Sequence, residues 1–106
     1  MRKEKLTMEI IKTQIGNTCA IELTGRIDTI TSPKLQAALD ESILSAVNIE
    51  LDFTEVDYVS SAGLRVLLQG EKTANSAGKT MTLKNVTPEV MEVFDITGFS
   101  AILTIK

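Results

Sequence analysis

The chain has 106 residues, of which 43% are hydrophobic and 24% are charged, and this is the size and composition of one ordinary globular domain. A net charge of −3 without a basic stripe excludes nucleic acid as the main ligand. The absence of histidine and the presence of a single cysteine, Cys19, exclude Ser-His-Asp catalysis, an internal disulfide and the usual histidine and cysteine metal sites.

The opening residues predict a β-hairpin. Residues 8–16 and 17–25 have the composition of two strands, and the Gly-Asn pair at their junction is typical of a tight hairpin turn. Apolar and polar residues alternate in the second strand, which places Cys19 on its buried face. Gly25 is expected to end this strand.

A helix and a third strand follow. Ser32 directly before Pro33 is typical of a helix N-cap followed by the first helical residue, and apolar residues keep helical spacing to about Ala46. Strict alternation of apolar and polar residues then predicts a strand over Val47–Phe53, which leaves residues 54–59 as a short connection.

The remaining elements alternate between helix and strand. A second helix is expected to begin at Ser60 or Ser61 and to end near Gly78. Residues 79–86 have the pattern of a fourth strand. A Thr-Pro pair then repeats the cap-and-proline start for a third helix, which stops at the next glycine, and a last strand is expected in residues 101–106.

The order β-β-α-β-α-β-α-β indicates an α/β fold, in which an N-terminal hairpin precedes right-handed crossovers and a mixed, mostly parallel sheet. The strands alternate between apolar and polar residues, whereas parallel strands covered on both faces read as continuous apolar runs. We therefore expect helices mainly on one face of the sheet, with the other face solvated or left for a partner.

Two adjacent serines begin the second helix, and the residues alone allow two interpretations of them. Ser60 or Ser61 can cap the helix, because a serine side chain accepts a hydrogen bond from an N–H of the first turn. The same end carries partial positive charge, so a phosphate there would be tolerated locally and would act on a docked partner. Gly63 either lets the helix pack closely on a strand or exposes its backbone to an approaching molecule.

Four segments resemble the STAS domain family, specifically its small stand-alone anti-sigma factor antagonists, also called anti-anti-sigma factors. In chain order they read ELTGRIDTITSPKL, IELDFTEVDYVSSAGLRVLL, GKTMTLKNV and FDITGFSAILTI. The resemblance runs from about Glu9 to Ile105, and its most specific parts are the Gly-x-Ile-Asp turn at Gly25–Asp28 and the Ser-Ser-Ala-Gly-Leu segment at Ser60–Leu64. It implies that residues 1–106 form a single STAS domain, with helices mainly on one side of the sheet.

The resemblance also implies a bacterial protein that regulates transcription by binding and is not an enzyme. In this family the unphosphorylated domain binds an anti-sigma factor, usually a serine kinase of the GHKL type, and thereby releases a sigma factor. Phosphorylation by the kinase dissociates the complex, and a PP2C-type phosphatase resets the switch. The alternative is a STAS interaction module or scaffold in a signalling assembly that works without phosphorylation.

The position that carries the phosphate in the family differs in this chain. The family motif has a serine or threonine directly before the Gly-Leu pair, and here that position is Ala62. Either Ser61 is the acceptor, with Ser60 as the second candidate, or this member is not phosphorylated at this site. One residue along a helix rotates a side chain by about 100°, so Ser61 is expected to face another direction than the usual acceptor.

A partner-binding surface is expected around the serine segment. It comprises Asp28, Asp57, Ser60, Ser61, Ala62, Gly63 and Arg65. Asp28 stabilises a loop turn in one interpretation. In the other, which the resemblance implies, its loop lies beside the serine segment and contributes to the partner surface. Asp57 is either solvated, a cap or part of that surface. Arg65 is either a solvated side chain or a contact to an acidic group.

We expect a cytoplasmic protein. A single cysteine suits a reducing compartment, and the basic N-terminus lacks the apolar segment of a signal peptide. No apolar run is long enough for a membrane span, and Walker and GxGxxG nucleotide motifs are absent. We accordingly expect no metal and no cofactor, and a monomer or weak dimer.

Overall fold

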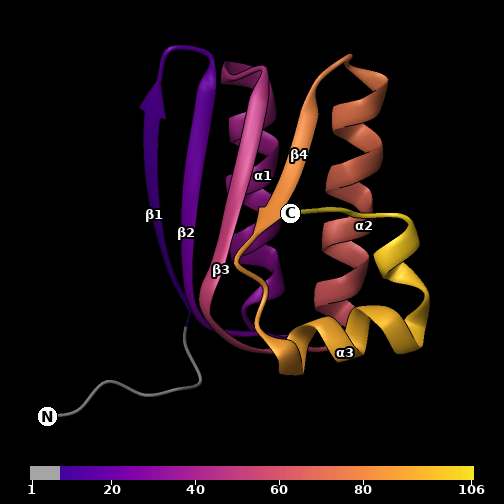
Figure 1. Ribbon diagram of the computed structural model, residues 1–106. Coiled ribbons are helices and arrows are strands. Elements are labelled where there is room, and N and C mark those ends of the chain that lie inside the picture. The colour runs from indigo at the N-terminus through magenta and orange to yellow at the C-terminus, as the bar shows by residue number, and fades with distance from the viewer. Residues whose placement is uncertain (1–7) are drawn as a thin grey trace, which may run out of the picture.

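The computed structural model describes residues 8–106, which form a five-stranded sheet with its main helices on one face (Figure 1). The elements are β1 (Met8–Ile15), β2 (Thr18–Ile27), α1 (Ser32–Ser45), β3 (Asn48–Val59), α2 (Ser61–Ser76), β4 (Thr80–Lys84), α3 (Pro88–Thr97), the 3-10 helix η1 (Phe99–Ala101) and β5 (Thr104–Ile105). The predicted order of elements is confirmed. The basic start of the chain, in which no signal peptide is expected, lies outside the described residues.

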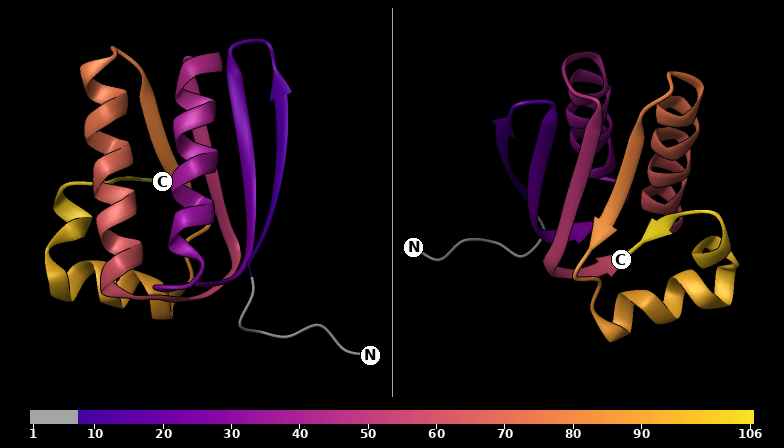
Figure 2. Two further views of the ribbon diagram at one scale, coloured as in Figure 1. Left: turned by 180° about the vertical axis from the view of Figure 1, so that it is seen from behind. Right: turned by 45° about the horizontal axis from the view of Figure 1, so that its top comes forward.

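The sheet has the strand order β1-β2-β3-β4-β5, with β1 antiparallel to β2 and all other neighbours parallel. α1 and α2 lie against one face, and α3 crosses the lower end of the sheet (Figure 2). On the opposite face β3 and β4 present polar, at least partly exposed side chains such as Glu50, Asp52 and Thr82. The predicted mixed α/β fold with helices mainly on one face is confirmed.

The core lies between the sheet and the helices and consists mainly of aliphatic side chains. Cys19 on β2 is buried as predicted, together with Leu39 on α1 and Leu51 on β3. Phe53 and Phe94 meet edge to face, with ring centroids 6.2 Å apart and an interplanar angle of 65°. This aromatic contact holds α3 against β3.

Three predicted strand boundaries are wrong. β2 does not end at Gly25 but continues to Ile27, residues 54–59 are the second half of β3, and only two residues of 101–106 form a strand. The first error arises because Gly25 lies within β2 and does not end it. The second arises because the β2–β3 register shifts after Glu22 and again after Gly25. Each shift places an extra residue on β3, and such a bulge breaks the alternation that predicts strands from sequence.

The predicted cap of α1 is also wrong, whereas that of α3 is confirmed. The cap position of α1 is Thr31, and Ser32 is the first helical residue. The Ser32 hydroxyl donates instead to the carbonyl oxygen of Asp28, so it ties the helix to the preceding loop. At α3, the Thr87 side chain accepts a hydrogen bond from the backbone N–H of Val90, as a capping threonine does.

Candidate functional site

Two strand-to-helix loops meet at one end of the sheet. β2 and β3 are parallel, so the loops that follow them begin at the same end of the sheet, which is the lower end in Figure 1. These loops are residues 28–31 and Ser60. The backbone N–H of Ser60 donates to the carbonyl oxygen of Ile27 at 2.8 Å and joins the second loop to the first. This carboxyl end of the strands is the usual binding edge of open α/β sheets. The fold thus brings Asp28 and the serine segment together.

Asp28 organises the first loop. Its Oδ1 accepts hydrogen bonds from the backbone N–H groups of Ile30 and Thr31, both at 3.0 Å, and its Oδ2 lies 3.5 Å from Nε of Arg26. The Thr31 N–H is the main reason why the pKa of the Asp28 carboxyl is below its ordinary value, because these bonds favour the charged form more than burial disfavours it. The structure therefore shows the turn role of Asp28, and the large apolar side chain that the loop presents to solvent is Ile30, 75% exposed.

A stacked pair beside this loop was not found from the sequence. Arg26 and Tyr58 are register partners on β2 and β3, and the Arg26 guanidinium carbon lies 4.2 Å from the centre of the Tyr58 ring. Tyr58 is 41% exposed. Arginine and tyrosine are the residue types that contribute most often to binding energy at protein interfaces. The pairing depends on the second bulge of β3, and the sequence gives no signal for a bulge at that place.

The two serines of the serine segment have different roles, one as the helix cap and the other as an exposed hydroxyl. Ser60 is the N-cap of α2, and its Oγ accepts a hydrogen bond from the backbone N–H of Gly63 at 3.3 Å. Ser61 is the first helical residue and is exposed, whereas Ala62 is half-buried. The predicted helix start is confirmed, and Ser61 is the serine that presents an accessible hydroxyl beside the N–H groups of the first turn.

Gly63 is required by packing. A Cβ at this position would lie 2.7 Å from Cγ2 and 2.9 Å from the carbonyl oxygen of Ile27, and 3.0 Å from Cγ1 of Val59. Gly63 is itself buried, so its backbone is not open to an approaching molecule. Of the two interpretations of this glycine, close packing of the helix on the strand is the one that the structure shows.

The exposed face of α2 starts at Ser61 and continues along the helix. Ser61, Arg65 and Gln69 are exposed at four-residue spacing, and Lys72 is exposed one turn further on. Asp57, in the bulged half of β3, is exposed as well. The expected partner-binding residues therefore lie at one end of the molecule, and those that are exposed are Asp57, Ser61 and Arg65.

The arrangement of these residues is better suited to binding another molecule than to catalysis by reacting groups. Residues 8–106 contain no group of three or more His, Cys, Asp or Glu side chains that could hold a metal ion. Over the same part of the chain, no helix has the length and apolar character needed to cross a membrane. The charged group of the two loops is Asp28, which pairs with Arg26 of β2, so the geometry favours contact with another molecular surface.

Known proteins with related sequences and folds were found along nearly the whole chain. The family model "Mlab, STAS domain" matches residues 12–104. The anti-sigma-B factor antagonist of Listeria monocytogenes is 32% identical over 87 residues, which cover 81% of this chain and 76% of the relative. The putative anti-sigma factor antagonist BtrV of Bordetella bronchiseptica is 32% identical over 102 residues, which cover 95% of this chain and 84% of the relative.

The fold is similar to that of the anti-sigma factor antagonist SpoIIAA. Its unphosphorylated form superposes with a TM-score of 0.78 at 19% identity, over 92% of this chain and 88% of that one. The phosphorylated form, from Bacillus, gives a TM-score of 0.72 at 18% identity, over 92% of this chain and 91% of that one. At these identities the likeness establishes the fold alone.

Replacing Gly63 with alanine is expected to lower the free energy of unfolding by about 1–3 kcal/mol, because the added Cβ meets the carbonyl oxygen of Ile27 and the backbone must shift. Gly70→Ala is the matched control on the same helix. There the added Cβ meets flexible side-chain ends, Sδ of Met81 at 3.0 Å and Cδ1 of Leu39 at 3.1 Å. Urea unfolding of both variants is the measurement, and equal stability of the two would contradict the packing role of Gly63.

The Asp28 carboxylate is expected to stabilise the protein above the pKa of the unfolded carboxyl and to lose this effect as the pH falls through its lowered pKa in the folded state. Asp28→Asn keeps an oxygen that can accept from the two loop N–H groups but removes the titration. The difference in free energy of unfolding between wild type and variant should be constant from pH 7 to about 5 and should shrink below about pH 4. A difference that does not change with pH would contradict this account.

Proposed function

The chain belongs to the STAS domain family, and we propose that it is an anti-sigma factor antagonist, which regulates transcription in the bacterial cytoplasm by binding an anti-sigma factor. Relatives that carry this name are 32% identical over most of the chain. The observation that carries the proposal is the junction of the Asp28 loop with the exposed start of α2, tied together by the Ser60–Ile27 hydrogen bond. The proposed function is binding, without enzymatic activity or a cofactor.

We infer that the contact surface has an apolar part and a basic part. Ile30 at the loop tip and the stacked Tyr58 supply exposed apolar area. Arg65 and Lys72 supply positive charge along α2, and Asp57 adds one negative charge next to Tyr58. A partner that fits this surface presents a small apolar patch beside acidic groups. Asp28 contributes by holding the loop in shape, since its carboxylate is already occupied by the loop N–H groups.

The proposed switch is phosphorylation of Ser61 by the anti-sigma factor, acting as a serine kinase of the GHKL type, with a PP2C-type phosphatase to reverse it. Ser61 is exposed at the first position of α2, where the partial positive charge of the helix start tolerates a phosphate. The phosphate adds about −1.5 to −2 charge. Arg65 lies four residues on, within reach of an ion pair on the same helix face. The phosphate would thus repel an acidic partner and occupy an arginine that the partner needs.

A STAS interaction module that works without phosphorylation is the second candidate. Ala62 supports it, because the residue at the family's acceptor position has no hydroxyl. In that case the same surface binds its partner permanently, or under the control of another component. The two candidates differ in one observable, which is whether ATP and the kinase change partner binding.

Incubation with ATP and the kinase that co-purifies with this protein from its own cells is expected to add one phosphate, detected by intact mass. Ser61→Ala should abolish the addition, whereas Ser60→Ala should retain it and lose about 1 kcal/mol of stability as the N-cap is removed. Ser61→Asp should bind the partner at least ~1 kcal/mol more weakly than wild type, and the neutral Ser61→Asn of similar size should bind like wild type.

Two results would contradict the switch. Labelling that persists in Ser61→Ala would place the acceptor elsewhere, and partner binding that ignores ATP and kinase would favour the unphosphorylated module. If Ser61→Asn weakens binding as much as Ser61→Asp does, the cause is the shape of the side chain and not its charge. Isothermal titration of the partner with each variant separates these outcomes.

A further inference from the structure

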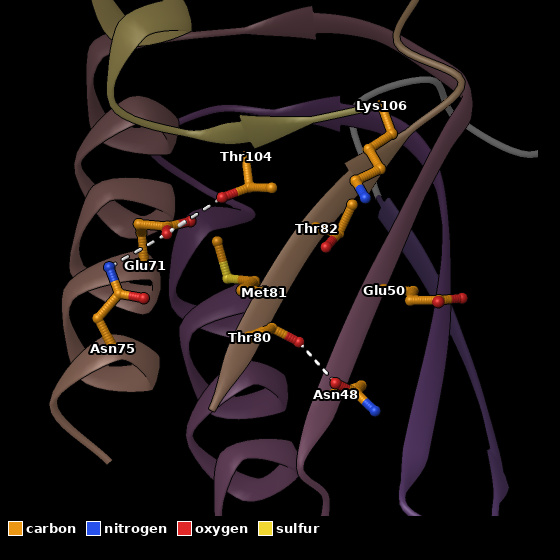
Figure 3. Close-up of a pocket in the computed structure, with 9 residues that line it drawn as sticks. All are labelled: Asn48, Glu50, Glu71, Asn75, Thr80, Met81, Thr82, Thr104 and Lys106. Carbon is orange, nitrogen blue, oxygen red and sulfur yellow. Dashed lines mark hydrogen bonds between the residues drawn. The ribbon is translucent and has the colours of Figure 1, made fainter. Parts of the chain in front are cut away.

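A cavity of about 330 Å³ lies beside β4 and is lined by residues of β3, α2, β4 and β5 and by Lys106 (Figure 3). β5 has two residues and pairs with Thr82 and Leu83 of β4, so the first residues of β4 have no strand beside them on that side. Glu71 on α2 lines the cavity about 15 Å along the helix from Ser61. The cavity is therefore separate from the proposed partner surface.

Glu71 is the unusual residue of this cavity. Its side chain is 5% exposed, and among residues 8–106 it is the charged residue that the fold buries. Oε2 accepts hydrogen bonds from Nδ2 of Asn75 at 3.3 Å and from Oγ1 of Thr104 at 3.4 Å. Oε1 is buried and has no hydrogen-bond partner in the described part of the chain. A buried carboxylate that lacks a donor on one oxygen is costly, so a positive group held beside the Glu71 carboxylate would be favourable.

The other charged residues that line the cavity do not pair with Glu71. Glu50 lines the cavity but is paired with Nζ of Lys84 at 3.4 Å. Lys106 lies across the cavity from Glu71, nearer to β4 (Figure 3), and no ion pair joins these two residues in the structure. Among the cavity's acidic groups, Glu71 is thus the carboxylate that lacks a cation.

The size and lining of the cavity indicate which group completes the site. Residues 8–106 contain no group of three or more His, Cys, Asp or Glu side chains that could hold a metal ion. A single carboxylate attracts a protonated amine, because a charge-assisted hydrogen bond can form between them. The volume is roughly ten times that of one liquid water and falls at the lower end of the range of small-molecule pockets. Apart from Met81, the residues that line it are polar or charged. A small polar molecule fits this description better than an apolar one.

We propose that this cavity binds a small polar molecule that carries a protonated amine, with the amine held beside the carboxylate of Glu71. The hydroxyl of Thr104 and the amide of Asn75 donate to Oε2 and fix the orientation of this carboxylate. The remainder of the molecule faces the threonine and asparagine side chains at the start of β3 and β4 and, at the far side, Lys106 (Figure 3). The inference does not depend on the proposed partner binding.

The test uses ethanolamine as the probe and ethylene glycol as a neutral molecule of the same size, each titrated into the ¹⁵N-labelled protein at pH 7 and followed by amide NMR shifts. Ethanolamine is expected to shift the amides of Glu71, Asn75 and Thr104 in a saturable way, and ethylene glycol is not. Glu71→Gln keeps the shape of the side chain and should weaken ethanolamine binding by roughly 10- to 100-fold, as the loss of a charge-assisted hydrogen bond predicts. The control Glu41→Gln, which removes a carboxylate paired with Lys12 outside the cavity, should change it less than about twofold, as expected for an exposed ion pair.

Absence of cavity shifts with ethanolamine, or equal shifts with both probes, would overturn the proposal. So would unchanged ethanolamine binding in Glu71→Gln. The amide spectrum of each variant shows whether it is folded, and the comparison of the two probes on the wild-type protein decides the matter if Glu71→Gln does not fold. None of these measurements uses the anti-sigma factor, so failure here leaves the proposed function untouched, and the reverse also holds.

Discussion

The first turn of α2 lies so close to the end of β2 that position 63 has room for a hydrogen atom and not for a methyl group. The Ile27 carbonyl oxygen accepts the N–H of Ser60, and a Cβ on Gly63 would lie 2.9 Å from the same oxygen. This contact sets the rotation of the helix at its start. Because Gly63 must face the strand, Ser60 becomes the cap and Ser61 faces solvent. The loop of Asp28 is held beside them by the same strand end.

The rotation of α2 at its start also determines what the alanine at the family's acceptor position changes. Ala62 is half-buried, so the lack of a hydroxyl at this position does not remove the hydroxyl from the exposed side of the helix start. That face still carries a hydroxyl, on Ser61, and an arginine one turn later, on Arg65. Capping and the proposed switch therefore fall on neighbouring serines with different tasks. The cap bond of Ser60 need not break for a phosphate to be placed on Ser61.

The fold followed from the sequence because it rests on regular patterns, whereas the place of the candidate site was an expectation from the family resemblance. Alternation predicted the strands, and cap residues with glycines predicted most helix ends. The failures lie where side chains or bulges override a local pattern. The predicted third strand is too short because two bulges interrupt the alternation of apolar and polar residues in β3. The cap position of α1 is Thr31 and not Ser32, because Asp28 binds the preceding loop into a turn. The Arg26–Tyr58 stack and the burial of Glu71 arise from tertiary packing, for which the chain has no local signal.

The central claim is that the carboxyl end of the sheet is the surface that meets the anti-sigma factor. Hydrogen exchange of the backbone amides, measured with and without the bound anti-sigma factor, tests it most directly. The account predicts slower exchange on binding in residues 28–31 and 61–69, with no change at the β1–β2 turn and after α2, at the other end of the molecule. Protection at that other end, or on the open face of the sheet, with the two loops unchanged, would contradict it.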